Sequence, residues 1–335
     1  MTLHTGLCDA LGIKYPIIQA PMMWIAGAGL AAAVSNAGGL GVIAKGTGER
    51  SFKLRKEDVE STRSEIRKFR TLSNRPFAVG NPEEPEFMEL MVEEKVPIVI
   101  TALGNPANFA KFYNDHGIKM IHMGSTVKHA KKCESLGCIA YIHAGFEAGG
   151  HDPGGRDYVT TFAGIPQVAD AVKIPVIAAG GVGDGRGLAA ALILGAQGVR
   201  MGTRFVATEE GLSHINHKNL IVNATDTATV WMGRWWGDYL RSLHTPYADK
   251  LYEMELKAVP VEKILEFMGG EGTADERTLP RRLRGQTDGD VQEGQFHAGQ
   301  IAGLIKEILP AAEVVRRVVA QAEEILAGAG KKYLK

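Results

Sequence analysis

Apolar residues in the first two-thirds of the chain gather into eight short runs that are bounded by turn residues. Most of these runs are continuous rather than alternating, which is typical of parallel strands that are covered on both faces. We therefore predict eight parallel strands. They correspond to Ile17–Ala20, Gly41–Ala44, Phe77–Gly80, Pro97–Thr101, Lys119–Met123, Ile139–His143, Val176–Ala179 and Gly198–Met201.

The segments between the runs predict helices. Some are amphipathic, and most of them end at a glycine, which commonly terminates a helix. Strands that alternate with helices indicate a parallel sheet, and eight such units in about 200 residues fit a closed barrel. We predict the α/β class and a TIM (β/α)8 barrel over residues 1–210. The predicted helices are Leu30–Ala37, Glu57–Arg70, Pro106–His116, Val127–Leu136 and Gly187–Leu194.

The alternation of strands and helices stops after the eighth run. Residues 211–284 predict a smaller, mostly helical inserted subdomain above the C-terminal face of the barrel, and they contain the aromatic segment Trp231–Tyr239. Residues 285–335 follow as closing helices packed on the barrel. We expect those helices at Gly294–Leu309 and Ala312–Leu326.

Composition narrows the class of protein. The 38 basic and 38 acidic residues balance, so no electrostatic footprint for nucleic acid or an anionic membrane exists. No apolar stretch is long enough to span a bilayer, and the first residues lack the pattern of a signal peptide. Cys8, Cys133 and Cys138 are too few and too badly spaced for a disulfide framework or a zinc site. We expect a cytoplasmic enzyme with a small-molecule substrate. The sequence does not decide between a monomer and a homodimer.

Two glycine-rich loops follow the seventh and eighth runs, Gly180–Gly187 and Gly202–Arg204. TIM barrels commonly bind phosphate at these two loops, where backbone N–H groups can approach the oxygens because no Cβ intrudes. Thr203 could add a hydroxyl donor. A turn-only role for the glycines is one alternative. Dinucleotide binding by Gly185–Ala190 is another, but the following strand ends in Arg200 and Met201 instead of the required acid.

A third loop, Gly145–Gly155, follows the sixth run and carries His151 among five glycines. An imidazole has a pKa suited to proton transfer near neutrality, so His151 is the candidate acid–base residue. Glu147 could orient it or could serve the loop itself. His214 and His217 are spaced like a metal pair, but no third ligand lies at helical spacing, so we expect a solvated face.

The residues around these loops resemble the nitronate monooxygenase family, formerly called 2-nitropropane dioxygenases. The family's scaffold also includes NAD(P)H:quinone reductases and FMN-dependent enoyl-thioester reductases. A late segment, Gly294–Leu304, resembles the family's closing helix. The motifs that carry the resemblance are Pro16-Ile-Ile-Gln-Ala-Pro-Met22, Ala33-Val-Ser-Asn-Ala-Gly-Gly-Leu-Gly41, Gly145-Phe-Glu-Ala-Gly-Gly-His151, Pro175-Val-Ile-Ala-Ala-Gly-Gly-Val-Gly-Asp-Gly-Arg-Gly187 and Met201-Gly-Thr-Arg-Phe205.

The resemblance implies that FMN is the cofactor and that His151 is the active-site histidine. Relatives usually end the third strand with Asn, precede the glycine of the histidine loop with a polar residue, and in some members end the fifth strand with Lys. This chain has Gly80, Ala144 and Met123 there, so Asn81 and His143 are the candidates to replace the lost flavin contacts. The implied cofactor-binding residues are Ala20, Pro21, Met22, Asn81, Ala144, Gly149, Gly150, Gly180, Gly181, Gly202 and Thr203, and the expected substrate pocket is Met23, Trp24, His143, Trp235 and Gln300.

Three functions follow from this reading. The leading one is oxidation of alkyl nitronates or nitroalkanes by O₂ to carbonyl compounds and nitrite, with His151 as the base. The second is an NAD(P)H-dependent reductase of quinones or enoyl thioesters, with NADH or NADPH as reductant. The third is a non-catalytic barrel that binds a phosphate ligand.

Overall fold

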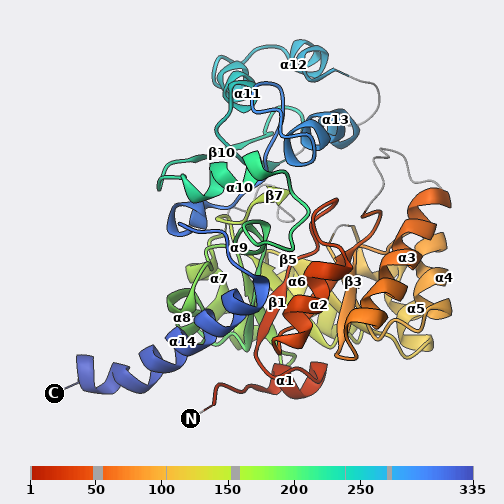
Figure 1. Cartoon of the computed structure of the whole chain (residues 1–335), viewed down its shortest axis with the longest axis vertical. Coiled ribbons are helices and arrows are strands. Elements are labelled where there is room, and N and C mark those ends of the chain that lie inside the picture. Colours follow the sequence, from red (N-terminus) through yellow and green to blue (C-terminus); the bar gives the residue numbers. More distant parts are fainter. Residues whose placement is uncertain are drawn as a thin grey trace.

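The computed structural model describes residues 2–47, 56–102, 104–151, 159–237, 239–269 and 274–334 (Figure 1). Eight parallel strands form one sheet in the order β1-β9-β8-β6-β5-β4-β3-β2. Backbone hydrogen bonds between β1 and Leu40, just before β2, join the two ends of the sheet, so the fold is a TIM barrel. The strands are β1 (Ile17–Gln19), β2 (Gly41–Ala44), β3 (Phe77–Gly80), β4 (Ile98–Thr101), β5 (Lys119–Gly124), β6 (Ala140–Ala144), β8 (Val176–Ala179) and β9 (Gly198–Met201).

Helices cover the outside of this barrel, and the short α1 (Gly6–Leu11) packs against the interior residues at its N-terminal end. The last helix, α14, packs on α2 and α8. The predicted helices are confirmed within a few residues, except that Pro106–His116 divides into a 3-10 turn, η1 (Pro106–Asn108), and α5. The covering helices are α2 (Ala28–Asn36), α3 (Lys56–Leu72), α4 (Pro85–Glu93), α5 (Ala110–Asp115), α6 (Val127–Ser135), α7 (Thr161–Ala171), α8 (Gly185–Ile193), α9 (Thr203–Val206) and α14 (Ala311–Tyr333).

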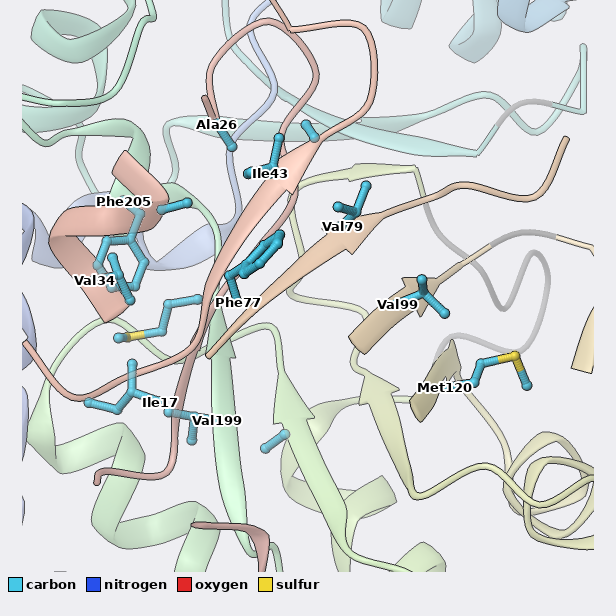
Figure 2. Packing of buried hydrophobic residues seen from close by; sticks show 14 of the residues in the cluster. Ile17, Ala26, Val34, Ile43, Phe77, Val79, Val99, Met120, Val199 and Phe205 are labelled. Atoms are coloured by element: carbon cyan, nitrogen blue, oxygen red, sulfur yellow. The ribbon is translucent and has the colours of Figure 1, made fainter. Parts of the chain in front are cut away.

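Alternating strand positions divide the apolar residues into two layers. Of two consecutive residues along a strand, one points into the barrel interior and the next packs outward against the helices. Interior examples are Ile18, Ile142 and Ile177. Figure 2 shows the outer layer, in which Ile17 of β1 lies beside Val199 of β9. Complete burial of each such side chain contributes roughly 1.5–3 kcal/mol, so both layers stabilise the barrel.

The inserted residues 211–284 are mostly helical but also contain a hairpin that the sequence did not predict. Its second strand, β11, also pairs with β7 (Gly150–His151), so that a three-stranded antiparallel sheet of order β10-β11-β7 forms. Figure 1 shows α11, α12 and α13 beyond this small sheet, on the side away from α1. The elements are α10 (Ile215–Val222), β10 (Thr229–Met232), β11 (Leu240–Leu243), α11 (Pro246–Leu256), α12 (Val261–Met268) and α13 (Ala274–Gln286).

The predicted closing helix Gly294–Leu309 is wrong, because only a 3-10 turn, η2 (Gln300–Leu304), forms there. Backbone groups of this segment bond to distant partners instead: the Gly299 N–H donates to Thr203 Oγ1, and the Gln300 N–H donates to the Glu147 carbonyl. A Cβ on Gly299 would lie 2.7 Å from the Glu147 carbonyl oxygen, so this close approach requires glycine. The second closing helix is confirmed as α14, which extends beyond the predicted end.

Candidate active site

A cavity of about 280 Å³ lies at the C-terminal ends of the barrel strands, and Arg282 and Gln286 of α13 also line it. It therefore occupies the place where TIM barrels hold their active sites. Most residues predicted from the sequence line it. These are Ala20, Pro21, Met22, Met23, Trp24, Asn81, Ala144, Gly149, Gly150, His151, Gly180, Gly181, Gly202 and Thr203.

Three predicted pocket residues lie outside this lining. Strand alternation places Ala144 on the cavity side of β6 and so turns His143 outward, where a Cβ on Gly164 of α7 would meet its Nε2 at 2.0 Å. Burial lowers the pKa of His143. Trp235 is 55% exposed, and its indole N–H donates to the carbonyl of Glu255. Gln300 is exposed at the start of η2.

Glu147 serves the loop rather than His151. Its carboxylate accepts hydrogen bonds from the backbone N–H of Thr161, at 2.9 and 3.1 Å, and from the Thr161 hydroxyl, at 3.1 Å. Thr161 is the first residue of α7, where a carboxylate satisfies otherwise unpaired N–H groups and favours the helix dipole. The structure therefore supports the role of Glu147 within the loop and, among the described residues, shows no contact by which it would orient His151.

The loops after β8 and β9 form a concave edge of the cavity. Gly180 and Gly181 have φ angles of +88° and +69°, which favour glycine on conformational grounds alone. Gly202 differs, because its φ of −104° suits any residue and a Cβ there would meet no atom closer than 3.6 Å. Neither backbone strain nor packing against the described residues explains a glycine at position 202, whereas a ligand close to this position would.

Thr203 can donate its hydroxyl proton into the same edge. Its Oγ1 accepts the Gly299 N–H at 2.9 Å, which orients the hydroxyl but leaves its hydrogen available. Asn81, opposite, has a φ of +59° and a buried Oδ1 that has no hydrogen-bond partner among the described residues. Open space at a glycine, a hydroxyl donor and an unsatisfied amide oxygen fit the phosphate and the polar ring edge of FMN.

His151 reaches the cavity from the small sheet, where Leu240 of β11 is its partner in register. Two residues that the sequence did not single out lie beside it. Arg282 of α13 has its Nη1 3.5 Å from His151 Nδ1, and the ring of His297 lies 5.5 Å from that of His151 in an edge-on arrangement. His297 lies in the segment Gly294–Leu304, whose resemblance to the family's closing helix was the one signal in the sequence that pointed to it.

His297 is held neutral by its surroundings. Burial, followed by the nearby Arg282, His151 and His217, lowers the pKa of His297 well below its usual value. A neutral imidazole can donate one hydrogen bond and accept another without a net charge. His297 can therefore act as a neutral hydrogen-bonding group beside His151.

His217 fixes the backbone that carries His297. Its Nε2 donates to the carbonyl oxygen of His297 at 3.1 Å, and its Nδ1 lies 2.7 Å from the hydroxyl of Ser213. The expectation that His214 and His217 form a solvated face is therefore wrong for His217, which is completely buried. Among the residues that the structure describes, no group of three His, Cys, Asp or Glu side chains could hold a metal ion.

We expect the buried His217 to make stability depend on pH. Burial lowers the pKa of His217 from 6.5 to about 4, so the unfolded chain binds this proton first as the pH falls. Stability should decrease from pH 6.5 to about pH 4, by about 3 kcal/mol at most from this residue. Denaturant unfolding of His217→Gln should show a shallower decrease over this range, and the exposed His116→Gln should match the parent. An equal slope in parent and His217→Gln would contradict the assignment.

Comparison with known proteins agrees with this geometry. The family described as nitronate monooxygenase matches residues 4–85 and 84–321. A probable nitronate monooxygenase of Staphylococcus saprophyticus is 31% identical over 97% of this chain and 99% of its own. A (3aS,4S,5R,7aS)-5-hydroxy-7a-methyl-1-oxo-octahydro-1H-indene-4-carboxyl-CoA dehydrogenase of Rhodococcus jostii is 39% identical, over 68% of this chain and 62% of its own length.

Solved structures extend the similarity to the whole fold. FabK from Thermotoga maritima has a TM-score of 0.87 and 36% identity, and the alignment covers 99% of this chain and 100% of FabK. Nitroalkane oxidase from Streptomyces ansochromogenes has a TM-score of 0.78 and 26% identity over 97% of this chain and 100% of its own. None of the described helices is both long and apolar enough to cross a bilayer. The chain belongs to the nitronate monooxygenase family and is an FMN-dependent oxidoreductase.

Proposed function

We propose that the protein oxidises alkyl nitronates, and the nitroalkanes from which they form, with O₂ as the oxidant. One nitronate and half an O₂ yield one carbonyl compound and one nitrite, so a C=N bond breaks and a C=O bond forms. FMN, when bound, supplies the redox chemistry by accepting electrons from the substrate and passing them to O₂. The observation that supports this proposal is His151 facing the same cavity as the glycine-lined edge, with Arg282 and His297 beside it.

The residues of this chain divide the work between two sides of the cavity. On the barrel side, Gly202 and Thr203 would bind the phosphate of FMN, and the backbone at Pro21 would lie against its ring. On the side of the inserted subdomain, His151 would remove the α-proton of a nitroalkane and Arg282 would favour the resulting anion.

Charge at the cavity also favours an anionic substrate. Arg282 is a permanent cation, and His297 is a neutral hydrogen-bonding group. Glu147 is the one acid in the lining among the described residues, and its carboxylate is bound at the start of α7. Within the described part of the cavity, a nitronate oxygen can approach His151 and Arg282 without meeting an uncompensated carboxylate.

Reduction of an enoyl thioester or a quinone by NADH or NADPH is the second candidate. It is favoured by the 39% identity to a relative whose name specifies a CoA ester substrate. The same His151 would then serve as a proton donor beside the substrate carbonyl.

An anaerobic comparison of reductants separates the two proposals. In the purified enzyme, the visible absorbance of bound FMN should be lost rapidly with propyl nitronate and only slowly with NADH or NADPH. In air, the same nitronate should give nitrite and propanal in equal amounts. Rapid bleaching by a reduced nicotinamide, with no nitrite from the nitronate, would overturn the monooxygenase proposal and support the reductase.

A further inference from the structure

Among the described residues that line the cavity, a single charged side chain comes from the barrel strands. Arg200 lies on β9, between Val199 and Met201, which both pack in the outer apolar layer. Because side chains alternate along a strand, Arg200 points to the interior, where it lines the cavity. Its neighbours there are small or apolar, namely Ala144, Ala179 and Met123.

Arg200 has no charged partner within the described part of the chain. Its Nη1 contacts the sulfur of Met123, a weak acceptor, and its Nε is buried without a hydrogen-bond partner among the described residues. Burial alone lowers the pKa of Arg200 to about 10, so the guanidinium stays charged at neutral pH. Arg200 is half-buried, and a cation that is partly withdrawn from water without an anion is unfavourable, so the protein retains a costly group at this place.

The position of Arg200 identifies the ligand group that can offset this cost. It lies on the barrel side, at the level of the edge formed by Gly202, two residues further along the same strand and loop. The groups suited to the substrate, His151 and Arg282, come from the small sheet and α13 on the other side. A flat ring that extends from the phosphate edge across the cavity would separate Arg200 from the substrate.

We propose that Arg200 faces the bound isoalloxazine and raises its reduction potential. A flavin that has gained two electrons carries a negative charge on its pyrimidine portion near neutral pH, and the oxidised ring does not. A cation beside that portion therefore favours the reduced form over the oxidised form. Arg200 is in this view a tuning residue for the cofactor rather than a binding residue for the substrate, and the inference rests on FMN occupying the cavity.

The test is the two-electron midpoint potential of bound FMN in variants at position 200. Arg200→Gln and Arg200→Met remove the charge, and Arg200→Lys retains it. We expect each neutral variant to lower the ratio of reduced to oxidised FMN at least tenfold, which is about 30 mV for a two-electron couple. Arg200→Lys should recover most of this difference. Lys119→Gln removes a positive charge from the start of β5, at the far end of the barrel, and should leave the potential unchanged.

A second measurement needs no variant. Reduced FMN should bind the wild-type protein at least about tenfold more tightly than oxidised FMN, so the bound potential should exceed that of free FMN. A bound potential below that of free FMN would overturn the proposal, even if the neutral variants fail to fold. Unchanged potentials in both neutral variants would also overturn the proposal. This holds even if the KM of the substrate increases in these variants. Absence of any FMN binding would instead overturn the cofactor site itself, which keeps the two failures distinct.

Discussion

Gly202→Val should weaken FMN binding at least about 100-fold while leaving the protein folded. Position 202 has a φ of −104°, which valine accepts, and a Cβ there would meet its nearest atoms at 3.6 and 4.0 Å. The added methyl groups would therefore occupy open space beside Thr203, where the phosphate is expected to bind. Loss of two hydrogen bonds to a charged group, each contributing about 1.5–3 kcal/mol, accounts for an effect of this size. Fluorescence titration of the apoprotein with FMN measures it.

The control for this prediction is a glycine substitution away from the cavity. Gly328 lies in α14 and a Cβ there would have no atom within 4 Å, so Gly328→Ala should keep the parent affinity for FMN. The melting temperature of apo Gly202→Val should also stay within about 3 °C of the parent, since domains of about 150–250 residues shift by only about 2–4 °C per kcal/mol. Parent-like FMN affinity in Gly202→Val would place the phosphate elsewhere.

His151→Ala should lower kcat/KM for a neutral nitroalkane by about 10²–10⁴, the usual contribution of a general base. The same variant should lose less than about tenfold with the preformed nitronate, because that substrate has already lost its α-proton. Steady-state nitrite formation with nitroethane and with ethyl nitronate gives both values. FMN content should be unchanged, because His151 approaches the cavity from the small sheet rather than from the glycine-lined edge.

Exposed His244 offers the matched control, and His244→Ala should behave as the parent with both substrates. Equal losses for the nitroalkane and the nitronate in His151→Ala would show that His151 binds or orients the substrate instead of removing its proton. Full retention of nitroalkane turnover would exclude His151 from the reaction.

The barrel could be predicted because each of its strands is specified by a short, continuous stretch of sequence. Each strand is a run of three to six residues that is buried on both faces, and a continuous apolar run is the signature of that environment. The glycine-rich loops follow directly from the strands, so the position of Gly180 or Gly202 in the cavity comes with the fold.

The other side of the cavity could not be predicted because it depends on pairings between distant residues. β7 is only Gly150 and His151, and its partner strand β11 lies about 90 residues further along the chain. Arg282 lies on α13 and His297 in an irregular segment. Both are more than 100 residues from His151 along the chain, and only the folded structure brings them beside it. No periodicity in the sequence marks such contacts.

Strand alternation could have corrected two interpretations. Ala140, Ile142 and Ala144 share the inner face of β6, so His143 had to point toward α7. Gly198 and Arg200 share the inner face of β9 by the same rule, so the Arg200 side chain had to point into the barrel. A period of two along the strand, applied residue by residue, would have placed both side chains.

We propose that the edge formed by Gly180, Gly181, Gly202 and Thr203 binds the phosphate of a flavin. Titration of the wild-type apoprotein with FMN and with riboflavin, which lacks only the phosphate, tests it most directly. FMN should bind at least about 100-fold more tightly than riboflavin, since two or more hydrogen bonds to a charged phosphate are lost. Equal dissociation constants for the two flavins, or no binding of either, would contradict the account.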